Sequence, residues 1–146
     1  MSAAPAVGAS PVVIDTNIVL DLLVFGDPRW TRLRAALETG ELRWLATAAM
    51  RDELLRVLGY PMIASRLLRD VRASAQVAAH YDAQVHTVEA TPARARFVCK
   101  DPDDQIFIDL AVAHRAMLLS KDRAVLVMRK RLATLGVEVA PTFEGR

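Results

Sequence analysis

The sequence predicts a single α/β domain, with a central parallel sheet of four to five strands and helices on both faces. Short apolar runs typical of buried strands alternate with longer stretches of helical periodicity. The chain has 146 residues, of which 53% are hydrophobic, which is enough for one sizeable core and too little for two comfortable domains. We therefore expect one domain over residues 11–146, preceded by a disordered tail at residues 1–10.

The first half of the chain begins with a short apolar run that ends at a polar triplet, as expected for a buried strand that leads into a helix. The first of the next two helices is expected to end before Asp27, and Asp27 and Pro28 can cap and begin the second. Gly40 ends that second helix. Thr47 stands where the N-cap of a further helix belongs. We expect strands at residues 12–14 and 42–46, and helices at residues 18–23, between Pro28 and Gly40, and from Thr47 to Gly59.

The second half continues the alternation of helices and strands. An Ala- and Arg-rich stretch at residues 62–84 reads as one long helix or two abutting ones. The helix expected at residues 104–115 is apolar on most of its surface and is therefore mostly buried. Further strands are expected at residues 85–88, 117–120 and 137–139, with a last helix at residues 123–135.

The composition indicates in which compartment the protein is expected and what charge its partner carries. The lone Cys99 cannot form an internal disulfide and is expected to be a core thiol in a reducing compartment. The N-terminal residues lack a signal-peptide pattern, and no run of about 18 apolar residues exists for a membrane span. We expect a soluble, cytoplasmic protein. Most of the 19 basic residues are Arg, a mild indication of an anionic partner.

Four carboxylates fall where a parallel sheet would gather them. Asp15 follows the first strand, Glu53 lies in the first turns after the second, Asp104 begins a helix, and Asp122 follows a later strand. Taken singly, each acid also has a structural explanation, such as a helix cap. Together they would repel unless a cation neutralised them, and carboxylate oxygens favour Mg²⁺ or Mn²⁺. Such an ion activates water for attack on a phosphate, so the sequence predicts phosphodiester hydrolysis.

The same residues carry a family resemblance. IDTN at residues 14–17, TAAMRDEL with Glu53, CKDPDDQIFIDLA at residues 99–111 and LLSKD at residues 118–122 resemble the successive motifs of PIN-domain nucleases. The form of the third motif most resembles the subgroup described as toxin components of toxin–antitoxin pairs. The resemblance covers residues 11–141 and implies a PIN-like three-layer α/β/α fold, an RNA substrate and an antitoxin partner.

Residue by residue, the resemblance places Asp15, Glu53, Asp104 and Asp122 at the catalytic metal-site positions. On an ideal helix Asp109 points about 140° away from Asp104, which indicates that it supports the site residues or the fold and does not bind the metal itself. Gln105 departs from the subgroup, in which a further acid is frequent at this position, and leaves less negative charge beside Asp104. We expect supporting roles for Asn17, Ser120, Asp109 and Asp101.

Basic residues flank the acidic motifs and could hold a nucleic-acid backbone beside the metal, although exposed loop charges explain them equally well. The three histidines share no ligand spacing and are expected to be structural or solvent-facing. The candidate substrate-binding residues are Arg94, Arg96, Lys100, Lys121 and Arg123.

Other functions stay open. An apolar strand followed by Asp15 and Thr16 superficially resembles haloacid-dehalogenase-type phosphatases, but these need a second acid where this chain has Asn17. A catalytically weak or inactive PIN-like module could act through RNA or protein binding. The apolar helices, especially residues 62–84, also leave room for a homodimer.

Overall fold

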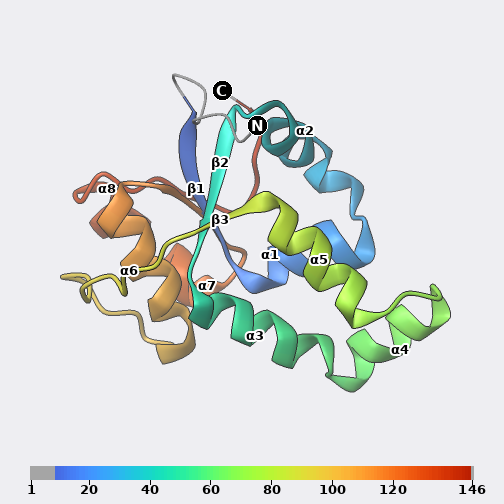
Figure 1. Ribbon diagram of the computed structural model, residues 1–146. Helices are drawn as coiled ribbons and strands as arrows, with labels where there is room; N and C mark the ends of the chain where they lie inside the picture. The colour runs from blue at the N-terminus through green and yellow to red at the C-terminus, as the bar shows by residue number, and fades with distance from the viewer. Residues whose placement is uncertain (1–8, 146) are drawn as a thin grey trace.

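A single five-stranded sheet organises the computed structural model, which describes residues 9–145. All strands are parallel, in the order β3-β2-β1-β4-β5 (Figure 1). The predicted fold class is confirmed, although most of the expected N-terminal tail lies outside the described residues. The strands are β1 (Ser10–Ile14), β2 (Leu42–Ala46), β3 (Val85–Thr87), β4 (Met117–Leu119) and β5 (Val139–Ala140).

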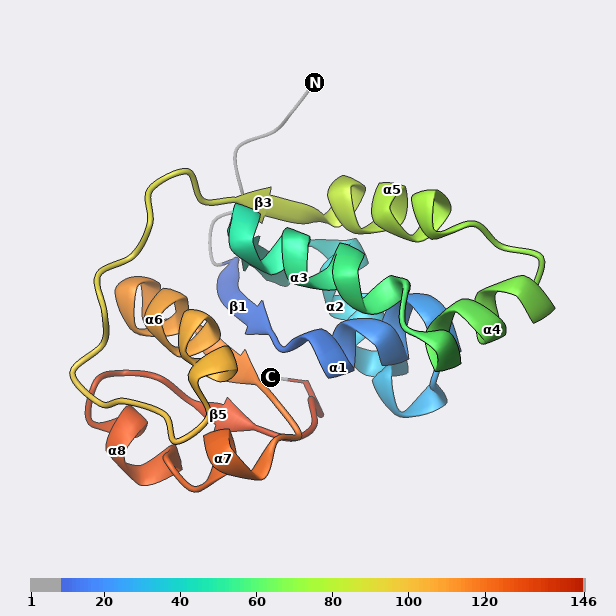
Figure 2. The ribbon, with the colours of Figure 1, turned by 90° about the horizontal axis from the view of Figure 1, so that it is seen from below.

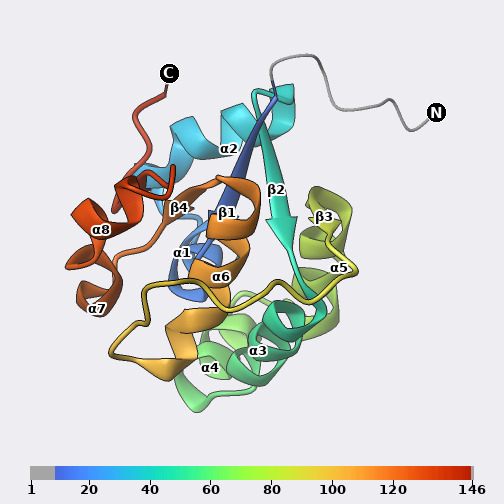
Figure 3. The same ribbon diagram turned by 90° about the vertical axis from the view of Figure 1, so that its left-hand side faces the viewer.

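Helices cover both faces of this sheet. In Figures 1 and 3, α6, α7 and α8 lie on one side of the strands, and α1, α2 and α5 lie on the other. A π-helical turn, η1, continues α1, while short 3₁₀ turns, η2 and η3, lead into α2 and α6. The helices are α1 (Thr16–Leu20), η1 (Asp21–Phe25), η2 (Pro28–Trp30), α2 (Thr31–Thr39), α3 (Ala48–Leu58), α4 (Pro61–Arg69), α5 (Ser74–Gln84), η3 (Pro102–Asp104), α6 (Gln105–His114), α7 (Arg123–Leu126) and α8 (Arg129–Ala133).

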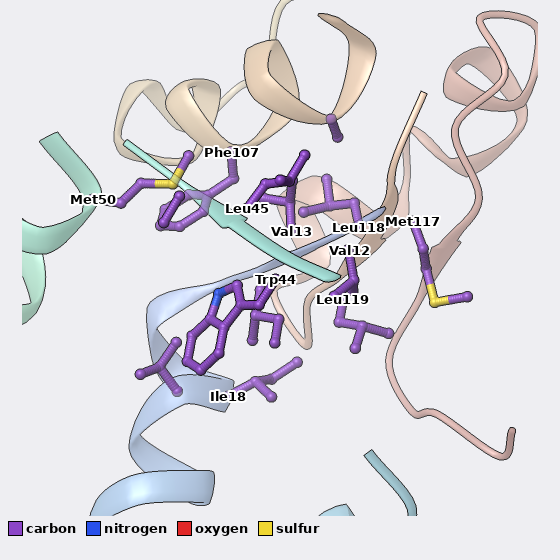
Figure 4. Packing of buried hydrophobic residues seen from close by; sticks show 14 of the residues in the cluster. Val12, Val13, Ile18, Trp44, Leu45, Met50, Phe107, Met117, Leu118 and Leu119 are labelled. Atoms are coloured by element: carbon purple, nitrogen blue, oxygen red, sulfur yellow. The ribbon is translucent and has the colours of Figure 1, made fainter. Parts of the chain in front are cut away.

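The core forms on both faces because strand residues alternate in direction. Val13 pairs in register with Leu118 and, in Figure 4, points to the same side as Leu45 and Phe107. Trp44 lies on the other side, and its indole packs edge-on against Tyr81 at 5.2 Å between ring centroids. The central strands are therefore buried on both faces, which explains the continuous apolar runs at residues 12–14 of β1 and 117–119 of β4.

The stretch at residues 62–84 forms two helices rather than one. α4 ends at Arg69 and α5 begins at Ser74, with Val71 between them in a left-handed conformation at φ 54°. This backbone region is unfavourable for a β-branched residue. The turn is held by Arg72, whose guanidinium donates to the Leu23 carbonyl oxygen at 2.8 Å.

The predicted last helix and last strand need correction. Residues 123–135 form the two short helices α7 and α8, because Met128 bonds three residues back to Val125 instead of four. The final strand is β5, one to two residues later than residues 137–139. Thr47 occupies the expected N-cap position of α3, but its side chain makes no capping hydrogen bond.

The carboxyl ends of the strands create the location for a site. The strand order changes direction between β1 and β4, because the chain crosses from β3 on one side of β1 to β4 on the other. The Asp15 N–H donates to the Leu119 carbonyl oxygen at 2.9 Å and joins these two strand ends. Figure 2 views the molecule from this end, with α1, α3, α6 and α7 around the end of β1. Within residues 9–145, no helix has the length and apolar character needed to cross a bilayer.

Candidate metal centre

Three of the four predicted acids meet at this end of the sheet. Asp15, Asp104 and Asp122 each offer a carboxylate oxygen, and these oxygens all lie within 4.8 Å of one another. They lie directly after β1, at the end of η3 and in the loop after β4. Residues about 90 and 20 positions apart in the sequence are thus brought together by the parallel sheet.

Asp15 is fixed by the transition from β1 to α1. It caps α1, since its Oδ1 accepts a hydrogen bond from the Asn17 N–H at 3.4 Å. Its Oδ2 accepts a hydrogen bond from the buried Ser120 hydroxyl at 2.7 Å. Burial of this side chain, which is 5% exposed, raises the pKa of Asp15, while the hydrogen bond from Ser120 offsets part of that rise.

Ser120 joins two of the acids. Besides donating to Asp15, its Oγ accepts a hydrogen bond from the Asp122 N–H at 3.1 Å. Asp122 in turn caps α7 by accepting from the Ala124 N–H at 2.9 Å. The carboxylate of Asp122 is therefore held at the helix start that faces Asp15.

Asp104 is the most perturbed acid of the cluster. It is 7% exposed, and its buried Oδ2 has no hydrogen-bond partner among the described residues. Burial, a hydrogen bond shared with Asp122 and the charge of Asp15 raise the pKa of Asp104 to about 8. A carboxyl in this position holds its proton at neutral pH unless a cation replaces it.

Glu53 lies beside the cluster rather than within it. From the second turn of α3, its Oε2 accepts a hydrogen bond from the Thr16 hydroxyl at 2.7 Å. Burial raises the pKa of Glu53, and the nearby charge of Asp15 contributes to that rise. Its carboxylate is not one of the three that share the 4.8 Å separation.

The predicted supporting residues take different places. The Asn17 side chain is exposed, and only its backbone N–H contacts Asp15. Asp101 caps η3 by accepting from the Asp103 N–H at 3.0 Å. Asp109 lies on α6 away from the acidic cluster and contacts Ala95.

The five predicted cationic residues are all exposed, but one is already paired. The Lys121 ammonium group contacts Asp21 Oδ2 at 2.5 Å, and the same oxygen accepts a hydrogen bond from the Trp30 indole at 3.0 Å. Arg123 lies in the first turn of α7, next to Asp122. The others, Arg94, Arg96 and Lys100, lie on the segment between β3 and η3.

The sequence did not reveal the roles of three residues that organise this region. Thr16 holds Glu53, Asp21 holds Lys121, and the buried Gln105 binds the segment before η3. A signal existed for Asp21, because it interrupts the apolar run at residues 18–25 and a buried charge needs a partner. No comparable signal pointed to Thr16.

The donor set fits a hard divalent cation. Its three side chains offer only carboxylate oxygens, which Mg²⁺ and Mn²⁺ prefer, and none offers the nitrogen or sulfur typical of zinc sites. The unpartnered Oδ2 of Asp104 is a buried acceptor that a cation would satisfy. Asp15, Asp104 and Asp122 could therefore bind a metal ion.

Comparison with known proteins identifies the fold family. The family model described as PIN domain matches residues 11–124, which is more than half of the chain and contains all four predicted acids. This chain belongs to the PIN domain family. The five-stranded parallel sheet and the acidic edge of this PIN domain agree with the resemblance drawn from the motifs.

One solved structure similar to this PIN domain is a chain of VapBC2 from Rickettsia felis, crystallised with a DNA fragment from the promoter of these proteins. The TM-score is 0.60 and the sequence identity 12%, and the match covers 88% of this chain and 98% of that one. At this identity the likeness concerns the fold. A search of curated proteins gives no match.

Proposed function

We propose that this PIN domain is a divalent-metal-dependent endoribonuclease, with Asp15, Asp104 and Asp122 as metal ligands and Glu53 completing the catalytic site. The observation that carries the proposal is the group of three carboxylates within 4.8 Å, one of which has a buried oxygen without a partner. Burying three carboxyl groups together opposes folding, because their ionised forms repel one another and at least one must hold its proton when no cation is bound. A site that binds Mg²⁺ or Mn²⁺ accounts for it.

The chain's own residues hold the acids ready for that role. Ser120 fixes the direction of the Asp15 carboxylate and the backbone of Asp122, and Thr16 fixes Glu53. When bound, a divalent cation supplies positive charge that lowers the pKa of a nearby water and offsets charge on a phosphate. Exposed cations beside the cluster would hold the nucleic-acid backbone on its open side.

The test is cleavage of single-stranded RNA with Mg²⁺ or Mn²⁺. We expect wild-type cleavage to stop in EDTA, and Asp104→Asn to lose roughly a hundredfold or more of the rate, as losses of key electrostatic groups do. Asp103→Asn is the matched control, since it removes an exposed acid one position away. Cleavage that survives EDTA or the Asp104 substitution would refute the proposal.

We further propose that the protein is the toxin of a toxin–antitoxin pair and binds a protein antitoxin. The fold likeness to a chain of the VapBC2 assembly supports this, as do exposed apolar side chains on and near α4. Met62, Leu68 and Val71 are 74%, 80% and 89% exposed, which is unusual for residues of their kind in one region.

The toxin proposal predicts growth arrest when the wild-type chain is expressed in bacteria. Co-expression of the product of an adjacent gene should relieve the arrest and co-purify with the chain. Asp104→Asn should abolish the arrest and still co-purify with that product. Normal growth on wild-type expression would argue for a nuclease outside toxin–antitoxin systems.

A further inference from the structure

The segment between β3 and η3, residues 88–101, crosses the outside of α6 without helix or strand. In Figure 3 it runs in front of α6 before it turns into the helix. Its far end lies at the acidic cluster, because the Cys99 thiol contacts the Ala124 carbonyl oxygen at 3.6 Å, two residues after Asp122. A segment of this length would be mobile unless side chains tied it down.

Two side chains of α6 bind this segment at three alternate residues. Asp109 Oδ1 accepts from the Ala95 N–H at 2.8 Å. Gln105 Oε1 accepts from the Cys99 N–H at 2.6 Å, and its amide nitrogen donates to the Phe97 carbonyl oxygen at 3.3 Å. Gln105 also donates to Asp109 Oδ1 at 2.8 Å, so the two side chains, one helical turn apart, act as a unit.

The alternation of these anchors determines which side chains face outward. Ala95 and Cys99 are buried and Phe97 is half-buried, whereas the intervening residues are exposed. Arg96 lies between the anchors, and Arg94 and Lys100 flank them; we call these three exposed cations the basic strip. The backbone bends at residues 96 and 97, and the Arg96 guanidinium lies 5.6 Å from the centroid of the Phe97 ring. The three exposed cations are the groups of this segment that can contact nucleic-acid phosphates.

The amide of Gln105 is suited to this task in a way that an acid is not. It faces two acceptors, the Phe97 carbonyl oxygen and Asp109 Oδ1, and only a donor can satisfy both. A carboxylate at this position would meet two oxygens without a proton to share and would repel Asp109. The departure from an acidic residue therefore has a structural reason.

We propose that Gln105 and Asp109 are positioning residues that hold the basic strip as a binding surface for the phosphates of single-stranded nucleic acid entering the acidic site. The proposal rests on the proposed nuclease function for its substrate class. It is tested by binding and not by cleavage, so that the basic strip and the nuclease function can each be refuted without the other.

The probe is a fluorescently labelled single-stranded 2′-O-methyl RNA, whose binding is measured by anisotropy over a series of salt concentrations. Asp109→Ala removes the acceptor shared by Ala95 and Gln105, and Arg94→Ala combined with Arg96→Ala removes two cations of the strip. Asp82→Ala is the matched control, since it deletes a carboxylate that also accepts two hydrogen bonds, both from Arg51.

We expect Asp109→Ala and the double arginine variant each to weaken binding about tenfold, and their combination to weaken it no further than the arginine variant alone. The slope of the logarithm of affinity against the logarithm of salt concentration should fall by about 1.4 when two phosphate contacts are lost. Asp82→Ala should bind as wild type. Amide hydrogen exchange at residues 95–99 should accelerate in Asp109→Ala, and this acceleration identifies loss of the anchor.

Additive losses of affinity, or wild-type affinity in Asp109→Ala despite faster exchange, would overturn the proposal. If Asp109→Ala does not fold, Gln105→Met removes three of the four hydrogen bonds that Gln105 and Asp109 make here, without adding charge, and is measured in its place. A wild-type protein that binds the probe with the expected coupling but cleaves no RNA would refute the nuclease and keep the basic strip. If the wild type cleaves RNA and Asp109→Ala binds the probe with wild-type affinity, the nuclease is supported and the role of Asp109 in holding the basic strip is refuted.

Discussion

Replacing Asp104 with asparagine is expected to stabilise the metal-free protein, and to do so increasingly as the pH rises. Burial, the hydrogen bond shared with Asp122 and the charge of Asp15 raise the pKa of this carboxyl from 3.8 to about 8. The unfolded chain therefore releases the proton near pH 4, whereas the folded chain keeps it until about pH 8. The resulting penalty on folding is absent below pH 4, grows through neutrality and is complete above pH 8.

The size of this effect follows from the pKa difference. Each pKa unit corresponds to about 1.4 kcal/mol, so the three units between pH 4 and pH 7 set an upper bound of roughly 4 kcal/mol at neutral pH. Relaxation of the site and entry of water reduce such penalties. We therefore expect Asp104→Asn to raise the free energy of unfolding by about 2 kcal/mol at pH 7, and by less than about 0.5 kcal/mol at pH 4.

Urea unfolding in EDTA at pH 4, 5.5, 7 and 8.5 measures this difference. Asp103→Asn serves as the control, because it removes a neighbouring exposed acid and should show no comparable trend. Saturating Mn²⁺ should reverse the order of stability, since the wild type gains binding energy that the variant lacks. A variant less stable than wild type in EDTA at every pH, or a difference that does not change with pH, would refute the reasoning.

Three further predictions concern the same site. Mn²⁺ affinity measured by calorimetry should rise roughly tenfold per pH unit between pH 6 and pH 8, because the cation displaces the proton of Asp104; a pH-independent affinity would contradict this. Ser120→Ala should lower the rate of RNA cleavage about ten- to a hundredfold, because Asp15 loses its buried hydroxyl donor. A wild-type rate in this variant would show that the orientation of Asp15 does not matter. Thr16→Val should reduce kcat several-fold through the loss of the hydrogen bond to Glu53, and should change the free energy of unfolding by no more than about 1 kcal/mol. Unchanged kcat and unchanged Mn²⁺ dependence would show that the hydrogen bond from Thr16 does not matter for the action of Glu53.

The sequence was sufficient for the sheet because its central strands are buried on both faces. The second strand was predicted at residues 42–46, its observed bounds, since a short and mostly apolar segment lies between Gly40 and the N-cap position Thr47. The interruptions between helices were harder to predict from the sequence. Val71 and Met128 mark breaks that carry no glycine or proline, and the break at Val71 depends on Arg72 reaching a carbonyl 49 residues away.

Some features of the candidate site could be predicted from the sequence, and others could not. Asp15 and Asp122 were predictable because both follow strands, and parallel strands end together. The contacts and exposure of the cationic side chains were not predictable, because they depend on residues that are distant in the sequence. Lys121 is paired with Asp21, 100 positions earlier, and the exposure of Arg96 depends on anchors in α6. Sequence spacing carries no information on such partners.

Crystals grown with MnCl₂ and measured near the manganese absorption edge test the acidic cluster most directly. We expect an anomalous peak between Asp15, Asp104 and Asp122, with carboxylate oxygens at about 2.1 to 2.2 Å, and its disappearance in Asp104→Asn crystals. The absence of an anomalous peak at the cluster in crystals grown with MnCl₂ at pH 8, or manganese bound only elsewhere on the surface, would contradict the assignment of these residues as a metal centre.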